Sequence, residues 1–176
     1  AIDPATGEIE WEWGESASTI ASPAVSEGVV IAVSDGLSAL KPYDSGGAEK
    51  LWQNNRLRPG FASPVLLTAG ETPLVAAISS GGILSVADLK TGDELGKARL
   101  NGKFWATPIV VGTGADARLM CPNADGEVVV VGFGEDGSPK VLARNTLGEE
   151  GLWASPAAAN DAVYFRSDAK LWKIAE

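Results

Sequence analysis

The chain of 176 residues contains no histidine and a single cysteine, Cys121. Any chemistry would therefore depend mainly on its acidic, basic and aromatic side chains. Without histidine, no serine or cysteine can be activated in the usual nucleophile pair, and zinc sites of the histidine and cysteine type are excluded. The 23 acidic residues show no catalytic spacing and no dense calcium-loop spacing. We therefore expect a protein that is not an enzyme and that holds no cofactor or metal.

Two glycine-rich stretches, residues 132–137 and 112–117, match the spacing of a dinucleotide-binding loop. Such a loop must open a helix, because the helix N-terminus holds the pyrophosphate. The first stretch runs into Ser138-Pro139 and the second soon meets Pro122. Both are therefore expected to be turns between strands.

A fourfold repeat organises the chain. Each copy begins with four residues in a fixed order: a large apolar residue, then Ala, then Ser or Thr, then Pro. The four prolines are spaced 41, 44 and 48 residues apart. The copies are residues 20–23, 61–64, 105–108 and 153–156. Short β-like runs separated by turn residues follow each proline, with no sustained helical period. Four strands in about 40–45 residues are typical of a propeller blade. We predict an all-β fold, a single β-propeller domain over residues 1–176 with four four-stranded blades: 14–55, 56–102, 103–147, and 148–176 completed by 1–13.

A second motif lies between the third and fourth strands of a unit, and its clearest copy is Ala1, Asp3, Thr6, Gly7 and Trp11. This pattern resembles the PQQ-like (quinoprotein-type, BamB-like) β-propeller repeat family. The resemblance implies that Trp11 and Trp52 dock between adjacent blades, while Gly96 and Val141 leave two junctions without that dock. It also implies a periplasmic or extracytoplasmic location, and rings of seven or eight blades.

The two ends of the chain complement each other. The last unit stops after its third strand, and residues 1–13 supply a turn and a fourth strand. We expect residues 1–13 to pair beside Leu171–Ile174, because this would cover an open sheet edge. The partner strand could belong to the same chain, in a four-bladed ring, or to a second chain, in an eight-bladed homodimer; the chain could also be half of a longer propeller. The resemblance favours the last two, and of all three we favour the ring of two chains.

The candidate site is a rim on one face of the propeller. Phe61, Trp105 and Trp153 directly precede the innermost strands, and three basic residues lie in the same connections: Arg56, Arg58 and Lys103. Aromatic residues beside arginine are typical of protein-binding surfaces. The alternative is that the three rings pack between blades as core. The turn aspartates Asp35, Asp125 and Asp168 should share this face as turn-capping residues.

The net charge of −9 disfavours nucleic acids and anionic lipid surfaces. No apolar run approaches the roughly 18 residues of a membrane helix, so no membrane insertion is expected.

The predicted function is a non-catalytic scaffold or a platform that binds a protein or small ligand near the propeller axis. One alternative is a segment of a PQQ-dependent dehydrogenase, or of another propeller enzyme, whose active residues lie outside this chain. The single cysteine forbids the vicinal disulfide of many such dehydrogenases. Exposed tryptophans leave carbohydrate binding as a further alternative.

Overall fold

The computed structural model describes residues 1–148 and 150–175, which form four antiparallel sheets with their strands hydrogen-bonded in chain order. The first sheet comprises β1 (Ala24–Ser26), β2 (Val29–Ser34), β3 (Gly36–Pro42) and β4 (Ala48–Asn54). The second comprises β5 (Val65–Ala69), β6 (Thr72–Ile78), β7 (Ile83–Asp88) and β8 (Glu94–Arg99). The third comprises β9 (Ile109–Val111), β10 (Arg118–Pro122), β11 (Glu127–Phe133) and β12 (Pro139–Thr146), with a 3-10 helix, η1 (Gly114–Asp116), after β9. The fourth comprises β13 (Ala157–Ala159), β14 (Ala162–Arg166) and β15 (Leu171–Ala175). The all-β fold of four repeated sheets is thereby confirmed.

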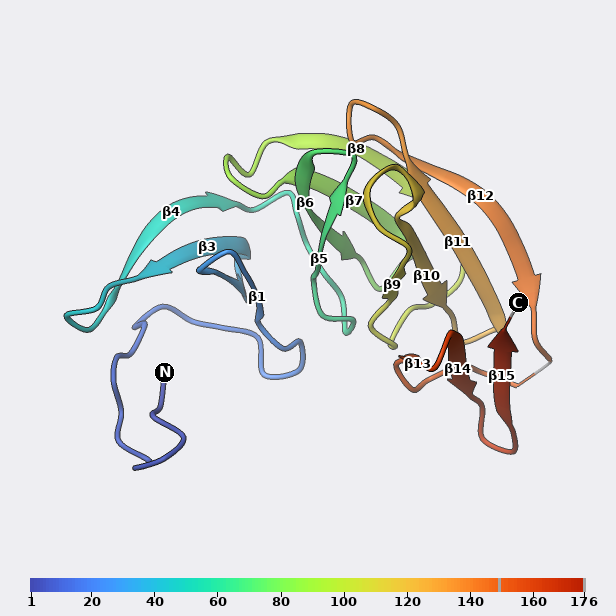
Figure 1. The fold of residues 1–176 in the computed structure, drawn as a ribbon, viewed down its shortest axis with the longest axis horizontal. Helices are drawn as coiled ribbons and strands as arrows, with labels where there is room; N and C mark the ends of the chain where they lie inside the picture. The colour runs from blue at the N-terminus through green and yellow to red at the C-terminus, as the bar shows by residue number, and fades with distance from the viewer. Residues whose placement is uncertain (149, 176) are drawn as a thin grey trace.

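The sheets follow one another along an open arc, with the two chain ends at opposite ends of the arc (Figure 1). The first strand of each sheet lies on the concave side, and the outer strands β4, β8 and β12 lie on the convex side. Tight turns make the meanders possible: Glu27 and Gly28 join β1 to β2 with φ angles of 49° and 75°, and Asn160 and Asp161 join β13 to β14 with 50° and 57°. Two successive positive φ values match the twist of an antiparallel hairpin.

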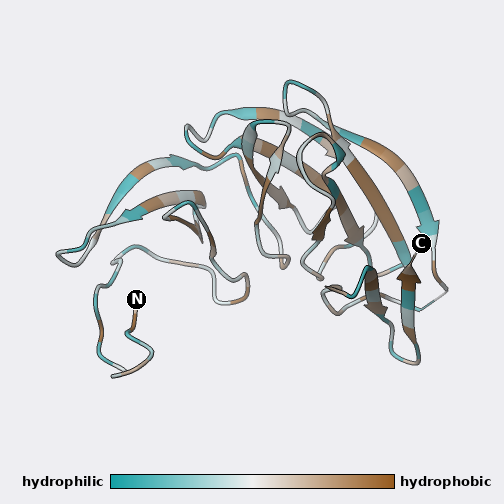
Figure 2. Cartoon of the chain, in the orientation of Figure 1, coloured by the Kyte–Doolittle hydropathy of each residue, from teal (hydrophilic) through white to brown (hydrophobic). Residues whose placement is uncertain are grey.

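The hydrophobic core is divided among the junctions between neighbouring sheets. The largest cluster lies between the second and third sheets and includes Leu84, Phe104 and Leu119, which are fully buried. The smallest lies between the third and fourth sheets, around Leu152 and Phe165. The middle strands of a sheet face a neighbour on both sides, so β6 and β11 are mostly apolar, whereas β4 and β12 carry many polar residues (Figure 2).

The N-terminal residues do not pair with β15 of their own chain. Ile2 forms a β-bridge with Ile9, and the amino group of Ala1 donates to the carbonyl oxygen of Trp11 at 2.7 Å. This hairpin lies near the first sheet, far along the arc from β15 (Figure 1). The single chain is thus an open arc, and a four-bladed ring closed within one chain is not the arrangement that it adopts.

Candidate functional site

The serine or threonine of each repeat joins neighbouring sheets through a hydrogen-bonded ladder. In each step a backbone N–H donates to the hydroxyl one repeat further on: Ser22 N to Ser63 Oγ at 2.9 Å, Ser63 N to Thr107 Oγ1 at 3.0 Å, and Thr107 N to Ser155 Oγ at 3.0 Å. The alanines that precede the first three of these residues, Ala21, Ala62 and Ala106, are buried because the sheets approach closely there. Sequence analysis found the repeated hydroxyl but missed its role, since spacing alone does not reveal a bond between repeats.

The residues that begin the repeats form an aromatic column on this ladder. The rings of Phe61 and Trp105 are stacked, with centroids 3.8 Å apart and an interplanar angle of 8°. Trp105 and Trp153 meet edge to face at 6.0 Å and 72°. Both arrangements are favourable aromatic geometries. Trp105 and Trp153 nevertheless remain 45% and 46% exposed, so the column packs on itself and also presents ring surface to solvent.

The predicted basic residues lie in the expected connections and are exposed. Arg58 forms an ion pair with Asp35 at 3.0 Å and also donates to the carbonyl oxygen of Asn55 at 2.7 Å. This pair joins the connection after β4 to the β2–β3 turn, as expected if both lie on one face. In the described part of the chain, the side chains of Arg56 and Lys103 make no hydrogen bond or ion pair, so their charges are available to a ligand.

Trp52 contacts the following sheet. Its indole N–H donates to the carbonyl oxygen of Leu89 at 2.9 Å, and its ring covers Gly92, where a Cβ atom would lie 2.6 Å from the indole. Trp11 lies beside the corresponding turn of the first sheet, with which it lines a pocket: Pro42, Tyr43, Asp44, Ser45 and Gly46. Gly96 stands where the repeat would have this tryptophan. Pro139 of the next sheet lies so close to it that a Cβ atom added at Gly96 would be 2.9 Å from the Pro139 side chain. Val141 is partly buried against the cluster between the second and third sheets.

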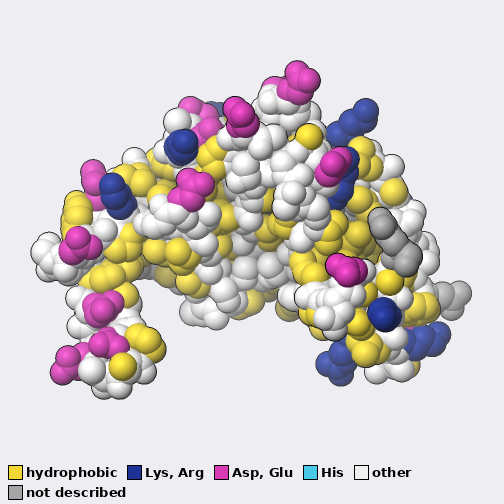
Figure 3. All heavy atoms as spheres, in the orientation of Figure 1, with side chains coloured by type: hydrophobic (Ala, Val, Ile, Leu, Met, Phe, Trp, Pro, Cys, Tyr) yellow, Lys and Arg dark blue, Asp and Glu magenta, His cyan; other side chains and the backbone are white. Residues whose placement is uncertain are grey.

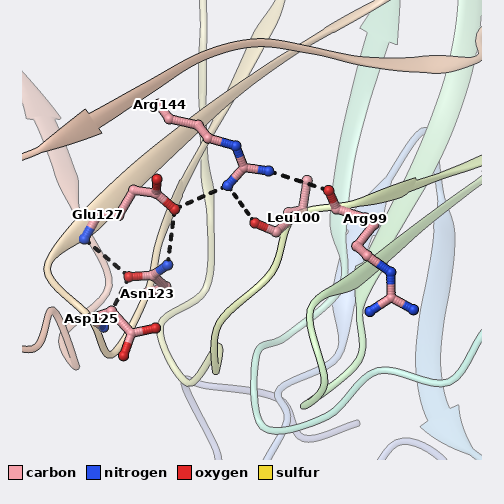
Figure 4. Close-up of polar contacts among 6 residues, drawn as sticks. All are labelled: Arg99, Leu100, Asn123, Asp125, Glu127 and Arg144. Atoms are coloured by element: carbon pink, nitrogen blue, oxygen red, sulfur yellow. Dashed lines mark hydrogen bonds and ion pairs between the residues drawn. The ribbon is translucent and has the colours of Figure 1, made fainter.

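A polar network that sequence analysis did not find fastens the second sheet to the third (Figure 4). Arg144 on β12 donates to the carbonyl oxygen of Leu100 at 2.6 Å and to Glu127 at 3.0 Å. Asn123 donates to the same Glu127 carboxylate at 3.3 Å and accepts from the backbone N–H groups of Asp125 and Glu127. These bonds connect β12, the β10–β11 turn and the segment that follows β8, so the network holds the second and third sheets together.

The remaining chemical groups offer no nucleophile or metal cluster in the described residues. Cys121 is fully buried, and burial raises the pKa of its thiol far above the usual range, so it stays protonated. No group of three or more acidic or cysteine side chains that could hold a metal occurs in residues 1–148 and 150–175. In the same residues, no helix is long and apolar enough to cross a membrane. The two glycine-rich stretches connect antiparallel strands, at β11–β12 and β9–β10, and open no α-helix.

Consecutive antiparallel meanders, three of four strands and the last of three among the described residues, pack face to face along an arc and define this chain as a β-propeller-type protein. The family model of the outer membrane protein assembly factor BamB matches residues 1–176, and the chain therefore belongs to this family of PQQ-like repeat proteins. No curated protein sequence matches the chain.

Solved structures share the fold at low identity. BamB from Moraxella catarrhalis is 18% identical with a TM-score of 0.60, over 86% of this chain and 42% of that one. The computationally designed Ika8 protein is 16% identical with a TM-score of 0.61, over 97% of this chain and 50% of that one. The designed Ika4 protein is also 16% identical with a TM-score of 0.61, over 96% and 99%. The chain thus spans less than half of the BamB chain that it matches.

Proposed function

We propose that this chain is a non-catalytic platform that binds a protein partner on the concave rim, in the extracytoplasmic part of the cell envelope. The observation that carries the proposal is the column of Phe61, Trp105 and Trp153. Aromatic side chains provide large contact areas and lose little conformational entropy on binding, which is why they dominate binding hot spots. The hydroxyl ladder and the ring stacking hold these side chains in position before a partner arrives, which lowers the cost of ordering them.

The charges around the column favour a partner with acidic groups beside an apolar anchor. The chain as a whole carries a net charge of −9, yet Arg56, Arg58 and Lys103 are exposed in the connections that precede Phe61 and Trp105. Charged groups at the edge of an interface mainly steer association and select the partner. The family name points to a partner that takes part in the assembly of outer membrane proteins.

The buried, protonated thiol of Cys121 and the structural role of the Arg144–Glu127 pair, which helps hold two sheets together, support a binding role over catalysis. Carbohydrate binding is the second candidate, because Trp105 and Trp153 present half-exposed rings on which a sugar could stack.

Site-specific photocrosslinking in cells tests the proposal. A photoreactive phenylalanine replaces Trp105 or Trp153, and the matched control replaces Thr68, which is exposed on β5. We expect adducts with outer membrane protein assembly components at the two tryptophan positions and none at the control. Trp105→Ala should then weaken binding of the identified partner by about 30-fold, the loss typical of a hot-spot residue. Equal adducts at all three positions would contradict the proposal, as would oxidation of an alcohol or sugar by the chain loaded with PQQ and calcium. Binding of oligosaccharides alone would favour the second candidate.

A further inference from the structure

Trp105 projects from the core at a fixed point of the backbone. Its chain neighbours, Phe104 and Ala106, are both buried, while the Trp105 side chain is 45% exposed. Phe61 of the preceding repeat and Trp153 of the following repeat contact its ring on either side. The places on both sides of Trp105 are thus filled within the chain, and ring surface remains exposed all the same.

The two tryptophans form a corner with two aromatic walls. The planes of the Trp105 and Trp153 rings meet at 72°, with centroids 6.0 Å apart, and each ring is nearly half exposed. Phe61 stacks on Trp105 at 3.8 Å. Trp153 packs closely on Gly151, where a Cβ would lie 2.6 Å from the indole nitrogen. The corner is therefore fixed before a ligand binds, and it suits a flat, compact apolar ring.

The corner also offers hydrogen-bond donors. Trp52, in the outer strand β4, donates its indole N–H to the carbonyl oxygen of Leu89 at 2.9 Å. Within residues 1–148 and 150–175, the indole N–H groups of Trp105 and Trp153 donate to no acceptor. An indole N–H that becomes buried normally finds a partner. A ligand that covers the corner should therefore bring acceptor groups with it.

The backbone beside the column is already used by the hydroxyl ladder. The N–H groups of Ser63 and Thr107, each two residues after a ring of the column, donate to the hydroxyls of Thr107 and Ser155, both at 3.0 Å. A ligand that adds a β-strand needs a row of free backbone N–H and C=O groups. Because the ladder occupies these donors, recognition at the column depends on side chains.

A proline-rich segment in the polyproline II conformation meets these conditions. This helix has no internal hydrogen bonds, so its carbonyl groups are free to accept from indole N–H groups. Proline-rich segments dock in grooves lined by aromatic side chains, and their preformed shape lowers the entropic cost of binding. Such a segment needs no backbone donor from the protein that binds it.

The segments that lead to Phe61 and Trp105 are basic. Residues 55–61 and 99–105 contain four basic residues and no acidic one, in a chain with a net charge of −9. Figure 3 shows acidic side chains over the N-terminal hairpin and along the convex side of the arc. The charge of these two segments is therefore opposite to that of the chain as a whole.

Three of these basic side chains are available to a ligand. Arg56, Arg99 and Lys103 are exposed, and among the described residues their side chains make no hydrogen bond or ion pair. Figure 4 shows the Arg99 guanidinium turned away from the polar contacts around it. The fourth basic residue, Arg58, is already paired with Asp35. Charge complementarity therefore favours a ligand with acidic residues.

The carboxylates near the column set the direction of the ligand. Glu150, which precedes Trp153, already accepts two hydrogen bonds from the β14–β15 turn. Asp125 lies beside Gly102, where a Cβ would be 2.9 Å from its Oδ2 atom, so it offsets only part of the unpaired positive charge. Acidic residues of a ligand are therefore favoured at the Phe61 end of the column and disfavoured at the Trp153 end.

We propose, on the basis of the binding function above, that the rim recognises a proline-rich segment of its partner in the polyproline II conformation. Prolines of the segment pack into the corner between Trp105 and Trp153, and the two indole N–H groups donate to its carbonyl oxygens. Acidic residues of the segment lie toward Phe61, where the three unpaired basic side chains contact them.

Titration calorimetry with synthetic peptides tests the proposal. The probe is a short proline-rich peptide with two glutamates, and two comparison peptides replace the glutamates by lysines or the prolines by alanines. We expect the 176-residue chain to bind the first peptide saturably and each comparison peptide at least about 10-fold more weakly. Equal binding of the alanine peptide would overturn the polyproline II conformation, and equal binding of the lysine peptide would overturn the charge preference.

The indole N–H signals in the NMR spectrum locate the peptide. On addition of the acidic proline-rich peptide, the signals of Trp105 and Trp153 should shift downfield, because these groups gain acceptors. The Trp52 signal is the internal control and should not move, since its N–H already donates to Leu89. Peptide binding that leaves the signals of Trp105 and Trp153 unmoved would contradict the proposed site.

Variants separate the roles of ring, donor and charge. Trp105→Ala should weaken peptide binding by about 30-fold. Trp105→Phe keeps the stacking and should weaken it by about 5-fold, through the loss of one hydrogen bond. The matched control Leu142→Ala, at a 48% exposed apolar side chain on β12, should leave binding unchanged. Lys103→Glu should cost about 10-fold, and Lys140→Glu, at an exposed position on β12, should cost nothing. Equal losses in variant and control would overturn the proposal.

The photocrosslinking experiment distinguishes failure of this proposal from failure of the proposed function. Protein adducts at Trp105 together with no binding of any proline-rich peptide would overturn the polyproline II mode and leave the platform function standing. If there are neither adducts nor peptide binding, both fail.

Discussion

The middle of the arc and its two ends are made of the same repeat, yet their side chains have different surroundings. In the middle, Ala62 and Ala106 are buried, and Ser63 and Thr107 each donate one ladder bond and accept another. At the ends, Ser22 and Ser155 each complete only one of these bonds. Ile20, which starts the first repeat, is 60% exposed, whereas Phe61 in the next is stacked on Trp105.

This difference shows that a single sheet of this type is not a complete structural unit. Each sheet buries its apolar faces and satisfies its backbone groups only with a neighbour on both sides, as expected of repeat proteins. Stability should therefore be greatest at the central junction and least at the ends.

The largest effect is expected from paired phenylalanine variants. Phe104 and Phe165 are both buried, in the central and the last cluster respectively. Phe104→Ala should reduce the free energy of unfolding by about 3–5 kcal/mol. Phe165→Ala should cost less, about 2–3 kcal/mol, because the smaller cluster can collapse or admit water. Urea denaturation measures both, and equal losses would contradict the difference between middle and end.

Glycine variants probe the contact between neighbouring sheets. Gly92→Ala places a Cβ 2.6 Å from the Trp52 ring at a φ of +75°, so it should cost about 1–3 kcal/mol. Gly28→Ala is the matched control, because Gly28 has the same φ of +75° and no atom lies within 4 Å of its added Cβ. Thermal unfolding should separate the two variants, and similar melting temperatures would argue against a tight Trp52 dock.

The hydroxyl ladder can be tested within and at the end of the arc. Thr107→Val removes the acceptor of the half-buried Ser63 N–H while keeping the shape of the side chain, and should cost about 1–3 kcal/mol. Ser22→Ala should leave the stability of the single chain nearly unchanged, since its hydroxyl accepts no ladder bond there. Denaturation at nanomolar concentration provides the comparison, and a large loss for Ser22→Ala would show that the ladder assignment is wrong.

A small pH effect is expected at the fourth sheet. The hydroxyl of Ser167 donates to Glu150 at 2.6 Å and the Ala169 N–H donates at 3.2 Å, and these bonds lower the pKa of Glu150 from 4.5. Because the folded pKa is depressed, this contribution to stability is fully present above pH 4.5 and is lost as the pH falls through the lowered pKa. Ser167→Ala removes the larger of the two causes and leaves the Ala169 bond, so NMR titration of Glu150 in that variant should give a pKa closer to 4.5.

The repeat pattern predicted much of the fold, because each proline starts an inner strand and each glycine turn ends one. The pattern also placed Phe61, Trp105 and Trp153 together. It could not predict their stacking, since that depends on how closely the sheets approach. The network of Arg144, Glu127 and Asn123 was not predictable for the same reason, as its members come from separate strands and connections.

The pairing expected between residues 1–13 and β15 was not found within one chain. Local sequence specifies the hairpin, whose turn Asp3, Thr6 and Gly7 encode, but the angle between neighbouring sheets decides whether four of them can close. Packing of whole sheet faces sets this angle, and no short motif encodes it.

Amide hydrogen exchange along the ladder tests the central claim, that each repeat is completed by the next. The amides of Ser22, Ser63 and Thr107 should exchange slowly and that of Ser155 rapidly, because Ser155 N donates to no ladder acceptor among the described residues. Equal exchange at all four amides would contradict the ladder.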